Sequence, residues 1–205
     1  MAPKNIKCFY FDSRGRAELS RLLLAAAGQE YEDIRFTKEQ WPAEKPNFPF
    51  HQLPALEVDG KRYGQSIAIA KYLAREFGFY GKSNLEGLEI DQVVHLAADF
   101  MNTFVPWFTE KDEAKKAEMQ KKLQEVEIPK FLGHFENLLK KSGTGYFVGN
   151  SLTLADFMVY DLIYAFISLK VLSTDGYPLV QAHSKKVESN ENIKAYLAKR
   201  KQTAF

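Results

Sequence analysis

The chain has 205 residues, of which 45% are apolar and 26% are charged, and its formal net charge at pH 7 is +2. This is the composition of an ordinary globular protein, and so small a charge gives no support for binding to nucleic acid or to a membrane surface. The chain has no apolar run long enough to span a bilayer, and its first residues, MAPKNIKC, lack the apolar segment of a secretory signal. We therefore predict a cytoplasmic protein.

Cysteine and histidine usage narrows the chemistry further. The one cysteine excludes an internal disulfide framework and any CxxC redox or zinc motif. None of the four histidines has a metal-binding spacing such as HExxH, and no phosphate-binding or dinucleotide-binding glycine pattern and no GxSxG occurs. The sequence therefore predicts no metal site and no nucleotide-dependent reaction.

The first eighty residues alternate between strand-like and helix-like segments. In chain order we predict a strand over 6–11, a helix over 15–27, a strand over 31–36, an irregular proline-rich segment over 38–52, a hairpin over 53–64 and a helix over 66–78. Ser66 suits the N-cap of the last helix. A strand–helix–strand unit crosses over right-handed and pairs its strands in parallel, so we predict a mixed sheet in an α/β domain over residues 1–81.

From residue 85 onward the apolar residues follow helical spacing and almost no strand pattern occurs. Ser83 with Glu86, and Thr153 with Asp156, are spaced as capping boxes that begin helices. We predict one long helix over 86–108 and an all-helical domain over residues 84–205.

The corner between the first strand and the first helix is the place for chemistry, because a helix N-terminus concentrates partial positive charge. Cys8 lies inside the apolar part of the strand and suits a buried small hydrophobe better than a nucleophile. Tyr10 ends the strand and can direct its hydroxyl into a cleft. From the residues alone, a tyrosine packed in the core is an equally acceptable interpretation.

Five motifs in order carry a resemblance to a known family: YFDSRGRAE, QWPAEK, PFHQLPALEVDG, QSIAIAKYLA and GNSLTLADF. In these, over essentially its whole length, the chain resembles a glutathione S-transferase of the sigma class. The resemblance implies a thioredoxin-like N-terminal domain with a four-stranded βαβ-ββα sheet, an all-α C-terminal domain and a homodimer. It also implies glutathione as cosubstrate. Ala98 stands where some enzymes of this class carry a second aspartate, so we expect no metal requirement.

The resemblance implies a role for specific residues. Tyr10 and Arg16 would be catalytic. The glutathione-binding residues would be Tyr10, Trp41, Lys45, His51, Gln52, Leu53, Pro54, Gln65, Ser66 and, from the partner subunit, Asp99. The pocket for the electrophile would include Phe11, Arg14, Phe104 and Trp107.

The resemblance also implies a cis peptide bond before Pro54, which frees the backbone of Leu53 to pair with the tripeptide. Structural alternatives stay open for several of these residues: a surface ion pair for Arg16, plain packing for Trp41 and Phe104, helix capping for Ser66, and an ordinary exposed carboxylate for Asp99.

Tyrosine suits the chemistry that the resemblance implies. A free thiol has a pKa of about 8.5, so little of it is thiolate at pH 7. A neutral phenol is still a hydrogen-bond donor at that pH, and a donor directed at sulfur stabilises the thiolate. We therefore expect an enzyme that joins glutathione to small hydrophobic electrophiles in detoxification.

Two other functions stay open. One is the glutathione-dependent isomerisation of prostaglandin H to prostaglandin D, which needs the same thiolate. The other is a non-catalytic carrier of hydrophobic ligands or a crystallin-like structural relative.

Overall fold

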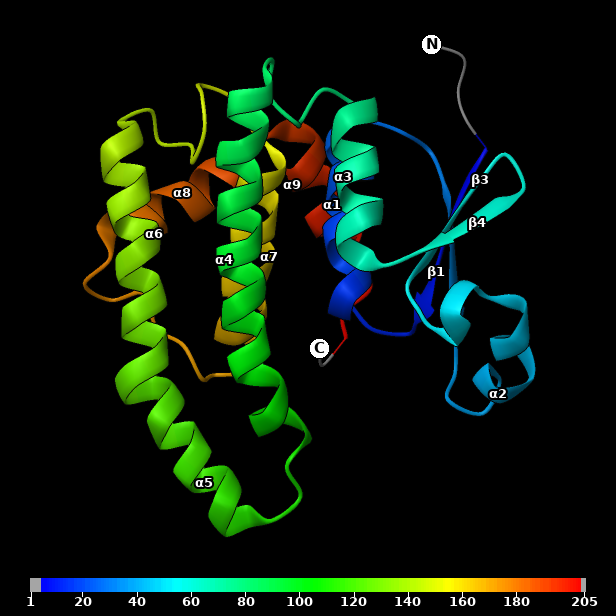
Figure 1. Cartoon of the computed structure of the whole chain (residues 1–205), viewed down its shortest axis with the longest axis horizontal. Coiled ribbons are helices and arrows are strands. Elements are labelled where there is room, and N and C mark those ends of the chain that lie inside the picture. The colour runs from blue at the N-terminus through cyan, green and yellow to red at the C-terminus, as the bar shows by residue number, and fades with distance from the viewer. Residues whose placement is uncertain (1–4, 204–205) are drawn as a thin grey trace. The chain divides into compact units, whose positions relative to one another are not determined.

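The computed structural model describes residues 5–203, which form two compact units (Figure 1). The first unit holds the described residues of Met1–Phe79 together with those of Glu188–Phe205, and the second is Tyr80–Val187. The first boundary lies close to the one expected after residue 81. The C-terminal residues differ from the expected division, because they pack with the α/β unit. A buried bond from Arg200 and a partly buried one from Tyr196, both to the carboxylate of Glu18, hold them there.

A four-stranded sheet organises the first unit. Its strands are β1 (Ile6–Phe11), β2 (Glu32–Phe36), β3 (Ala55–Val58) and β4 (Lys61–Gly64), in the order β2-β1-β3-β4. β1 pairs in parallel with β2, as the strand–helix–strand rule predicts, and in antiparallel with β3, which forms the predicted hairpin with β4. The mixed sheet predicted from the sequence is confirmed.

Side chains of β1 alternate between the two faces of this sheet. One face carries Ile6 and Cys8, which are almost fully buried. On the other face, Phe9 packs with Phe48 and Ala55 in a core cluster that Trp41 also contacts. The helices of this unit are α1 (Glu18–Ala26), α2 (Trp41–Glu44), α3 (Ser66–Glu76) and α9 (Glu191–Lys199), and the short 3-10 turns are Gly15–Ala17, Lys45–Asn47 and Pro49–His51.

The helices of the second unit are α4 (Asn84–Thr109), α5 (Glu113–Lys122), α6 (Ile128–Ser142), α7 (Leu154–Ser168) and most of α8 (Pro178–Glu188), with a π-helical turn at Leu123–Glu127. α7 is apolar on nearly every side and lies at the centre, against α4. Phe100 stacks on Phe131 with their ring centroids 4.7 Å apart. An all-helical unit was predicted, and the observed α4 extends the expected helix by two residues at its start and one at its end.

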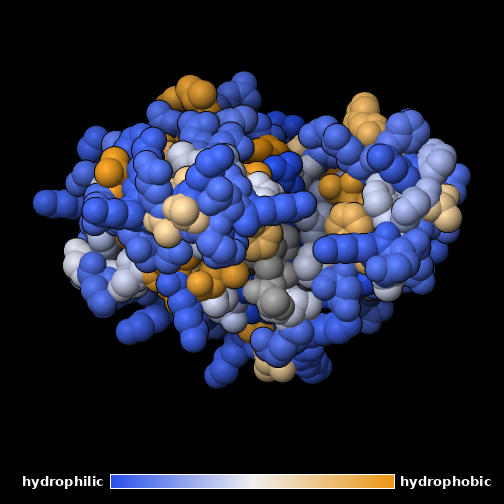
Figure 2. All heavy atoms as spheres, turned by 90° about the horizontal axis from the view of Figure 1, so that it is seen from below, coloured by the Kyte–Doolittle hydropathy of each residue, from blue (hydrophilic) through white to orange (hydrophobic). Residues whose placement is uncertain are grey.

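The surface is mostly hydrophilic on the face drawn in Figure 2, with small separate hydrophobic areas. The most exposed large apolar side chain among the described residues is Phe50, at 69%. Within residues 5–203, no helix is both long enough and apolar enough to cross a membrane.

Candidate functional site

The corner after β1 holds Tyr10 in a defined position. The backbone N–H of Arg16 donates a hydrogen bond of 3.2 Å to the hydroxyl oxygen of Tyr10. This bond uses the oxygen as an acceptor, so the hydroxyl proton is left to be donated elsewhere. Arg16 N–H belongs to the 3-10 turn that leads into α1, where backbone N–H groups lack partners within the helix. The phenol therefore lies at the positive end of a helix, half-exposed.

Gly15 makes room for the Tyr10 ring. Its φ is +39°, a left-handed value that favours glycine. A Cβ added at Gly15 would lie 2.7 Å from both Oη and Cε1 of Tyr10, closer than real atoms approach. The absence of a side chain at position 15 thus determines where the Tyr10 hydroxyl lies.

The two arginines of this corner differ from each other. Arg16 is exposed and contributes its backbone to Tyr10, so electrostatic support from its side chain stays a prediction. Arg14, expected in the electrophile pocket, has only 6% of its surface exposed. Of Arg14 and Arg16, only Arg14 has its guanidinium side chain buried at the corner.

Cys8 lies inside the sheet core with 1% of its surface exposed. Burial raises the pKa of its thiol to about 12, and the attraction of the Arg21 cation offsets only part of this effect. The reactive thiolate is therefore absent at neutral pH. This burial confirms the interpretation of Cys8 as a buried small hydrophobe.

We expect Cys8 to resist alkylation by iodoacetamide at pH 8 in the folded protein and to react quickly once the chain is unfolded in guanidinium. The folded pKa lies above the unfolded value, so this group also removes stability as the pH rises from about 9 towards about 12. Mass spectrometry of the alkylated protein checks the first point. Fast labelling of the native protein would contradict the buried assignment.

The loop after β2 gathers several predicted glutathione-binding residues. The Trp41 ring packs between Phe11 and Phe48, with centroids 5.9 Å and 5.5 Å away. Lys45 is exposed, and its carbonyl oxygen lies 3.2 Å from Nδ1 of His51. This packing matches the alternative of plain packing for Trp41. The residue is half-exposed, so part of it also lies at the surface of the loop.

The peptide bond between Leu53 and Pro54 is cis, as the resemblance implies. Pro54 is buried, Leu53 is half-buried and Gln52 is exposed. These residues lie directly before β3, which pairs antiparallel with β1, so the backbone of Leu53 and the end of β1 lie at the same end of the sheet.

Gln65 has an unusual backbone conformation, with φ of 72° and ψ of 103°. Non-glycine residues avoid this region at a cost of about 1–3 kcal/mol, and such strain concentrates at functional sites. The predicted N-cap role of Ser66 is wrong: Ser66 is the first helical residue of α3, and the N-cap position is Gln65. The non-helical φ and ψ of Gln65 end the preceding segment, and the helical conformation begins at Ser66.

The remaining predicted residues are divided between the units. Phe11 and Arg14 belong to the first unit, and Asp99, Phe104 and Trp107 to the second. Asp99 is exposed on α4. Phe104 is 1% exposed and stacks on Phe166 with centroids 4.1 Å apart, which matches its alternative interpretation as a core residue. An electrophile pocket built from both units stays a prediction.

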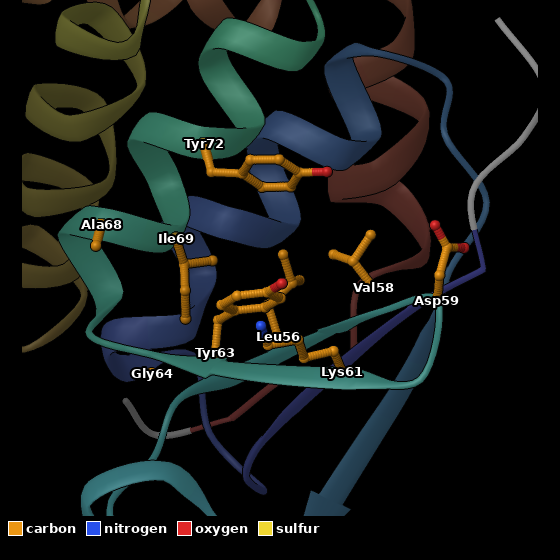
Figure 3. A pocket seen from close by; sticks show the side chains of 9 residues that line it. All are labelled: Leu56, Val58, Asp59, Lys61, Tyr63, Gly64, Ala68, Ile69 and Tyr72. Atoms are coloured by element: carbon orange, nitrogen blue, oxygen red, sulfur yellow. The ribbon is translucent and has the colours of Figure 1, made fainter.

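A cavity of about 570 Å³ lies in the first unit between the β3–β4 hairpin and α3 (Figure 3). Its lining residues are Leu56, Val58, Asp59, Lys61, Tyr63, Gly64, Ala68, Ile69 and Tyr72. None of them is a predicted glutathione-binding residue, so this cavity is separate from the corner that holds Tyr10. Figure 3 shows the Tyr63 ring on the hairpin and the Tyr72 ring on α3, both among the lining side chains.

The sequence interpretation did not single out two residues of the corner, Gly15 and Arg21. Arg21 is fully buried and donates hydrogen bonds to the backbone of the corner. A signal was present, because Glu18 and Arg21 lie three residues apart in a helix that is otherwise rich in leucine. Charges on such a helix are buried only when they are paired.

Comparison with known proteins identifies the class of protein that has this fold and this corner. The family model for the glutathione S-transferase N-terminal domain matches residues 7–75, and the model for the glutathione S-transferase C-terminal domain matches residues 98–200. The chain belongs to the glutathione S-transferase family, a family of enzymes, and the fold predicted from the resemblance is confirmed.

Curated relatives match along almost the whole chain. The probable glutathione S-transferase 7 of Caenorhabditis elegans is 43% identical over 202 residues, which are 97% of this chain and 98% of the relative. The S-crystallin SL11 of Nototodarus sloanii is 38% identical over 200 residues, 96% of this chain and 97% of that protein.

Solved structures also match the fold along almost the whole chain. A Nu-class enzyme of the family from Haemonchus contortus has a TM-score of 0.92 at 40% identity, covering 98% of this chain and all of that one. A structure described as prostaglandin synthase D of Nilaparvata lugens has a TM-score of 0.91 at 33% identity, covering 97% of this chain and all of that one.

Proposed function

We propose that this chain is a glutathione transferase that uses Tyr10 to hold glutathione as a thiolate and joins its sulfur to small hydrophobic electrophiles. One observation carries the proposal: the Tyr10 hydroxyl accepts the Arg16 N–H and keeps its own proton for a ligand at the positive end of a helix.

The physical requirement is modest. Lowering the pKa of the glutathione thiol by about two units would make thiolate the main form near neutral pH and corresponds to about 2.7 kcal/mol. A phenol that accepts one hydrogen bond becomes a stronger donor in the next, because hydrogen bonds in a chain polarise one another. The bond from Arg16 N–H to Tyr10 therefore strengthens the bond that Tyr10 would donate to sulfur.

The reaction then needs little else from the protein. The thiol proton leaves to solvent, and the thiolate forms a carbon–sulfur bond with the electrophile. In the same step a leaving group such as chloride departs with its electron pair, or an activated double bond accepts the pair and later a proton. The protein supplies orientation and stabilises charge.

The other residues that we expect to bind the tripeptide also belong to the first unit. The strained Gln65 and the first-turn residue Ser66 present a hydroxyl and backbone N–H groups to the glutamyl carboxylate. The backbone of Leu53 would pair with the cysteinyl part, and Trp41 and Lys45 would flank the glycyl end, with His51 and Gln52 beside them and Pro54 holding the turn.

We place the enzyme in the sigma class and the cytoplasm, acting in detoxification without a metal, although one similar structure is described as Nu-class. We also propose a homodimer in which Asp99 reaches the neighbouring subunit's glutathione amine. The exposed apolar side chains of Phe50 and Tyr63, of which Tyr63 lines the cavity of Figure 3, support burial against a second copy.

Replacing Asp99 by alanine should weaken glutathione binding by about 1–3 kcal/mol, the range for one lost charge-assisted contact. Asp99 is exposed, so the melting temperature should not change. Calorimetry of glutathione binding measures the effect, with Glu89→Ala on the exposed surface of the same helix as the control. Equal affinities would remove Asp99 from the site, and a monomer in sedimentation at micromolar concentration would refute the shared site.

Two measurements test the proposed function itself. The protein should be retained on immobilised glutathione and eluted by free glutathione, and it should conjugate glutathione to chlorodinitrobenzene. Retention without turnover would favour a carrier or crystallin-like relative instead. A protein that shows no retention on glutathione and no turnover would refute the proposal.

A second candidate is the isomerisation of prostaglandin H to prostaglandin D, favoured by the likeness to the structure described as prostaglandin synthase D. It would use the same Tyr10 and thiolate, and the electrophile pocket would decide between the two. Product analysis after incubation with the endoperoxide and glutathione separates them: an excess of prostaglandin D over the uncatalysed mixture supports the isomerase.

A further inference from the structure

Seven charged side chains of the first unit are linked in a row by six ion pairs, and we call this set the charge ring. In order along the row they are Arg200, Glu18, Arg21, Asp33, Arg35, Asp12 and Lys201. Positive and negative groups alternate from Arg200 to Lys201, and the backbone that joins these two neighbouring cations closes the ring. The ring joins the corner after β1, helix α1, strand β2 and the residues that follow α9.

The pairs of the charge ring are close. Arg200 Nη1 lies 2.7 Å from Glu18 Oε1, and Arg21 Nη1 lies 3.4 Å from Glu18 Oε2. Arg21 Nε donates to Asp33 at 3.0 Å. On the other side of the ring, Asp33 pairs with Arg35 at 2.9 Å.

The last pairs complete the row. Arg35 pairs with Asp12 at 3.2 Å, and Asp12 with the ammonium group of Lys201. The bond from Lys201 lowers the pKa of Asp12, so this carboxylate is ionised at neutral pH.

Arg21 connects the charge ring to the catalytic corner. Its Nη1 donates a 2.8 Å hydrogen bond to the carbonyl oxygen of Ser13 and a longer one, of 3.4 Å, to that of Arg14. These two carbonyls begin the turn in which Gly15 faces the Tyr10 ring and Arg16 N–H meets its hydroxyl. The Arg21 guanidinium therefore holds the backbone of the turn in place, and this backbone in turn positions the Tyr10 hydroxyl.

Burial makes this arrangement rigid. The side chains of Glu18 and Arg21 are fully buried, and that of Arg200 is 4% exposed. Burial alone lowers the pKa of the Arg21 guanidinium, but the carboxylates of Asp33 and Glu18 raise it by more. Such charges are stable inside a protein only when all partners are in place, so Arg200 and Lys201, which follow α9, and the corner hold one another in register.

We propose that Arg21 is a positioning residue for Tyr10 and that the C-terminal residues Arg200 and Lys201 take part in glutathione activation through the charge ring. This inference rests on the proposed role of Tyr10. The inference goes beyond the proposed function, because it assigns a role in the chemistry to Arg200 and Lys201. These two residues lie more than 180 positions from Tyr10 along the chain.

The test is the pKa of bound glutathione, read from the ultraviolet absorbance of the thiolate, in Arg21→Lys and Arg200→Gln. Lysine keeps the charge but cannot hold Ser13, Glu18 and Asp33 at once with a planar fork. We expect Arg21→Lys to raise this pKa so that thiolate at pH 7 falls about threefold to tenfold, with the KM for glutathione within about twofold of the wild type.

Arg200→Gln leaves Glu18 its bonds to Tyr196 and Arg21, so the variant should fold. We expect it to lower thiolate about twofold to threefold. Lys199→Gln, the exposed neighbour at the end of α9, is the matched control and should change nothing.

The outcomes separate this inference from the proposed function. If Tyr10→Phe shifts the thiolate titration but Arg21→Lys and Arg200→Gln lower only the melting temperature, the charge ring is merely structural and the inference is wrong. If Tyr10→Phe itself leaves the thiolate titration unchanged, the proposed role of Tyr10 is wrong, and the inference that rests on it is wrong as well. Should Arg21→Lys not fold, Arg200→Gln against its control decides the matter.

Discussion

Replacing Tyr10 by phenylalanine is expected to lower kcat for conjugation by about one to two orders of magnitude, with the glutathione KM little changed. The ring and its packing against Gly15 remain, and only the hydroxyl that meets Arg16 N–H is lost. The tripeptide keeps its other anchors, so binding persists while activation of the sulfur is lost. Steady-state kinetics with chlorodinitrobenzene over a range of pH measures the effect, and the rate profile should move to higher pH.

The matched control is Tyr63→Phe, which removes a hydroxyl from an exposed ring that lines the cavity in Figure 3 and should leave kcat unchanged. Cys8→Ala should reduce stability and spare activity, since the thiol is buried. If Tyr10→Phe retains near-normal turnover while Cys8→Ala or Ser13→Ala abolishes it, the assignment of the corner is wrong.

Replacing Asp156 by alanine is expected to lower the free energy of unfolding by about 2–5 kcal/mol. The predicted capping box with Thr153 is present, and the carboxylate accepts four bonds in a fully buried place. Two come from the N–H and hydroxyl of Thr153, each 2.7 Å long, one from the N–H of Phe147 and one from Nε2 of His183, each 3.0 Å long. A cap alone is worth about 0.5–2 kcal/mol, so the other donors make the loss larger than the capping box predicts.

Thermal and urea unfolding measure this effect. For a chain of this size a loss of that magnitude corresponds to a fall in Tm of about 5–15 °C. Asp99→Ala, which removes an exposed carboxylate from the same unit, is the control for stability and should leave Tm unchanged. The KM for glutathione should stay the same in Asp156→Ala, and a large KM change without a fall in Tm would reverse the assignment.

Patterns that depend on neighbours in the chain were predicted well. The strands, the hairpin with its Asp59–Gly60 turn and the long helix α4 occur close to their expected bounds, because period and turn chemistry are local properties. The prediction placed the N-cap at Ser66, one residue after its observed position, because a sequence gives no signal for a positive φ at a residue such as Gln65.

Features that depend on long-range pairing could not be predicted in the same way. The C-terminal residues return to the first unit because Arg200 meets Glu18 in its interior, and nothing local to either residue indicates a partner 182 positions away. Likewise, the resemblance predicts Tyr10 as the catalytic residue, but its hydrogen bond to a backbone N–H and the glycine that admits its ring are results of the fold.

The central claim is that the Tyr10 hydroxyl stabilises the glutathione thiolate, and titration of bound glutathione by its thiolate absorbance tests it most directly. The wild type should give a thiol pKa well below the value of about 8.5 for a free thiol, and Tyr10→Phe should return it towards that value with glutathione still bound. A thiol pKa in the wild type equal to that of free glutathione, or one that is the same in Tyr10→Phe, would contradict the account.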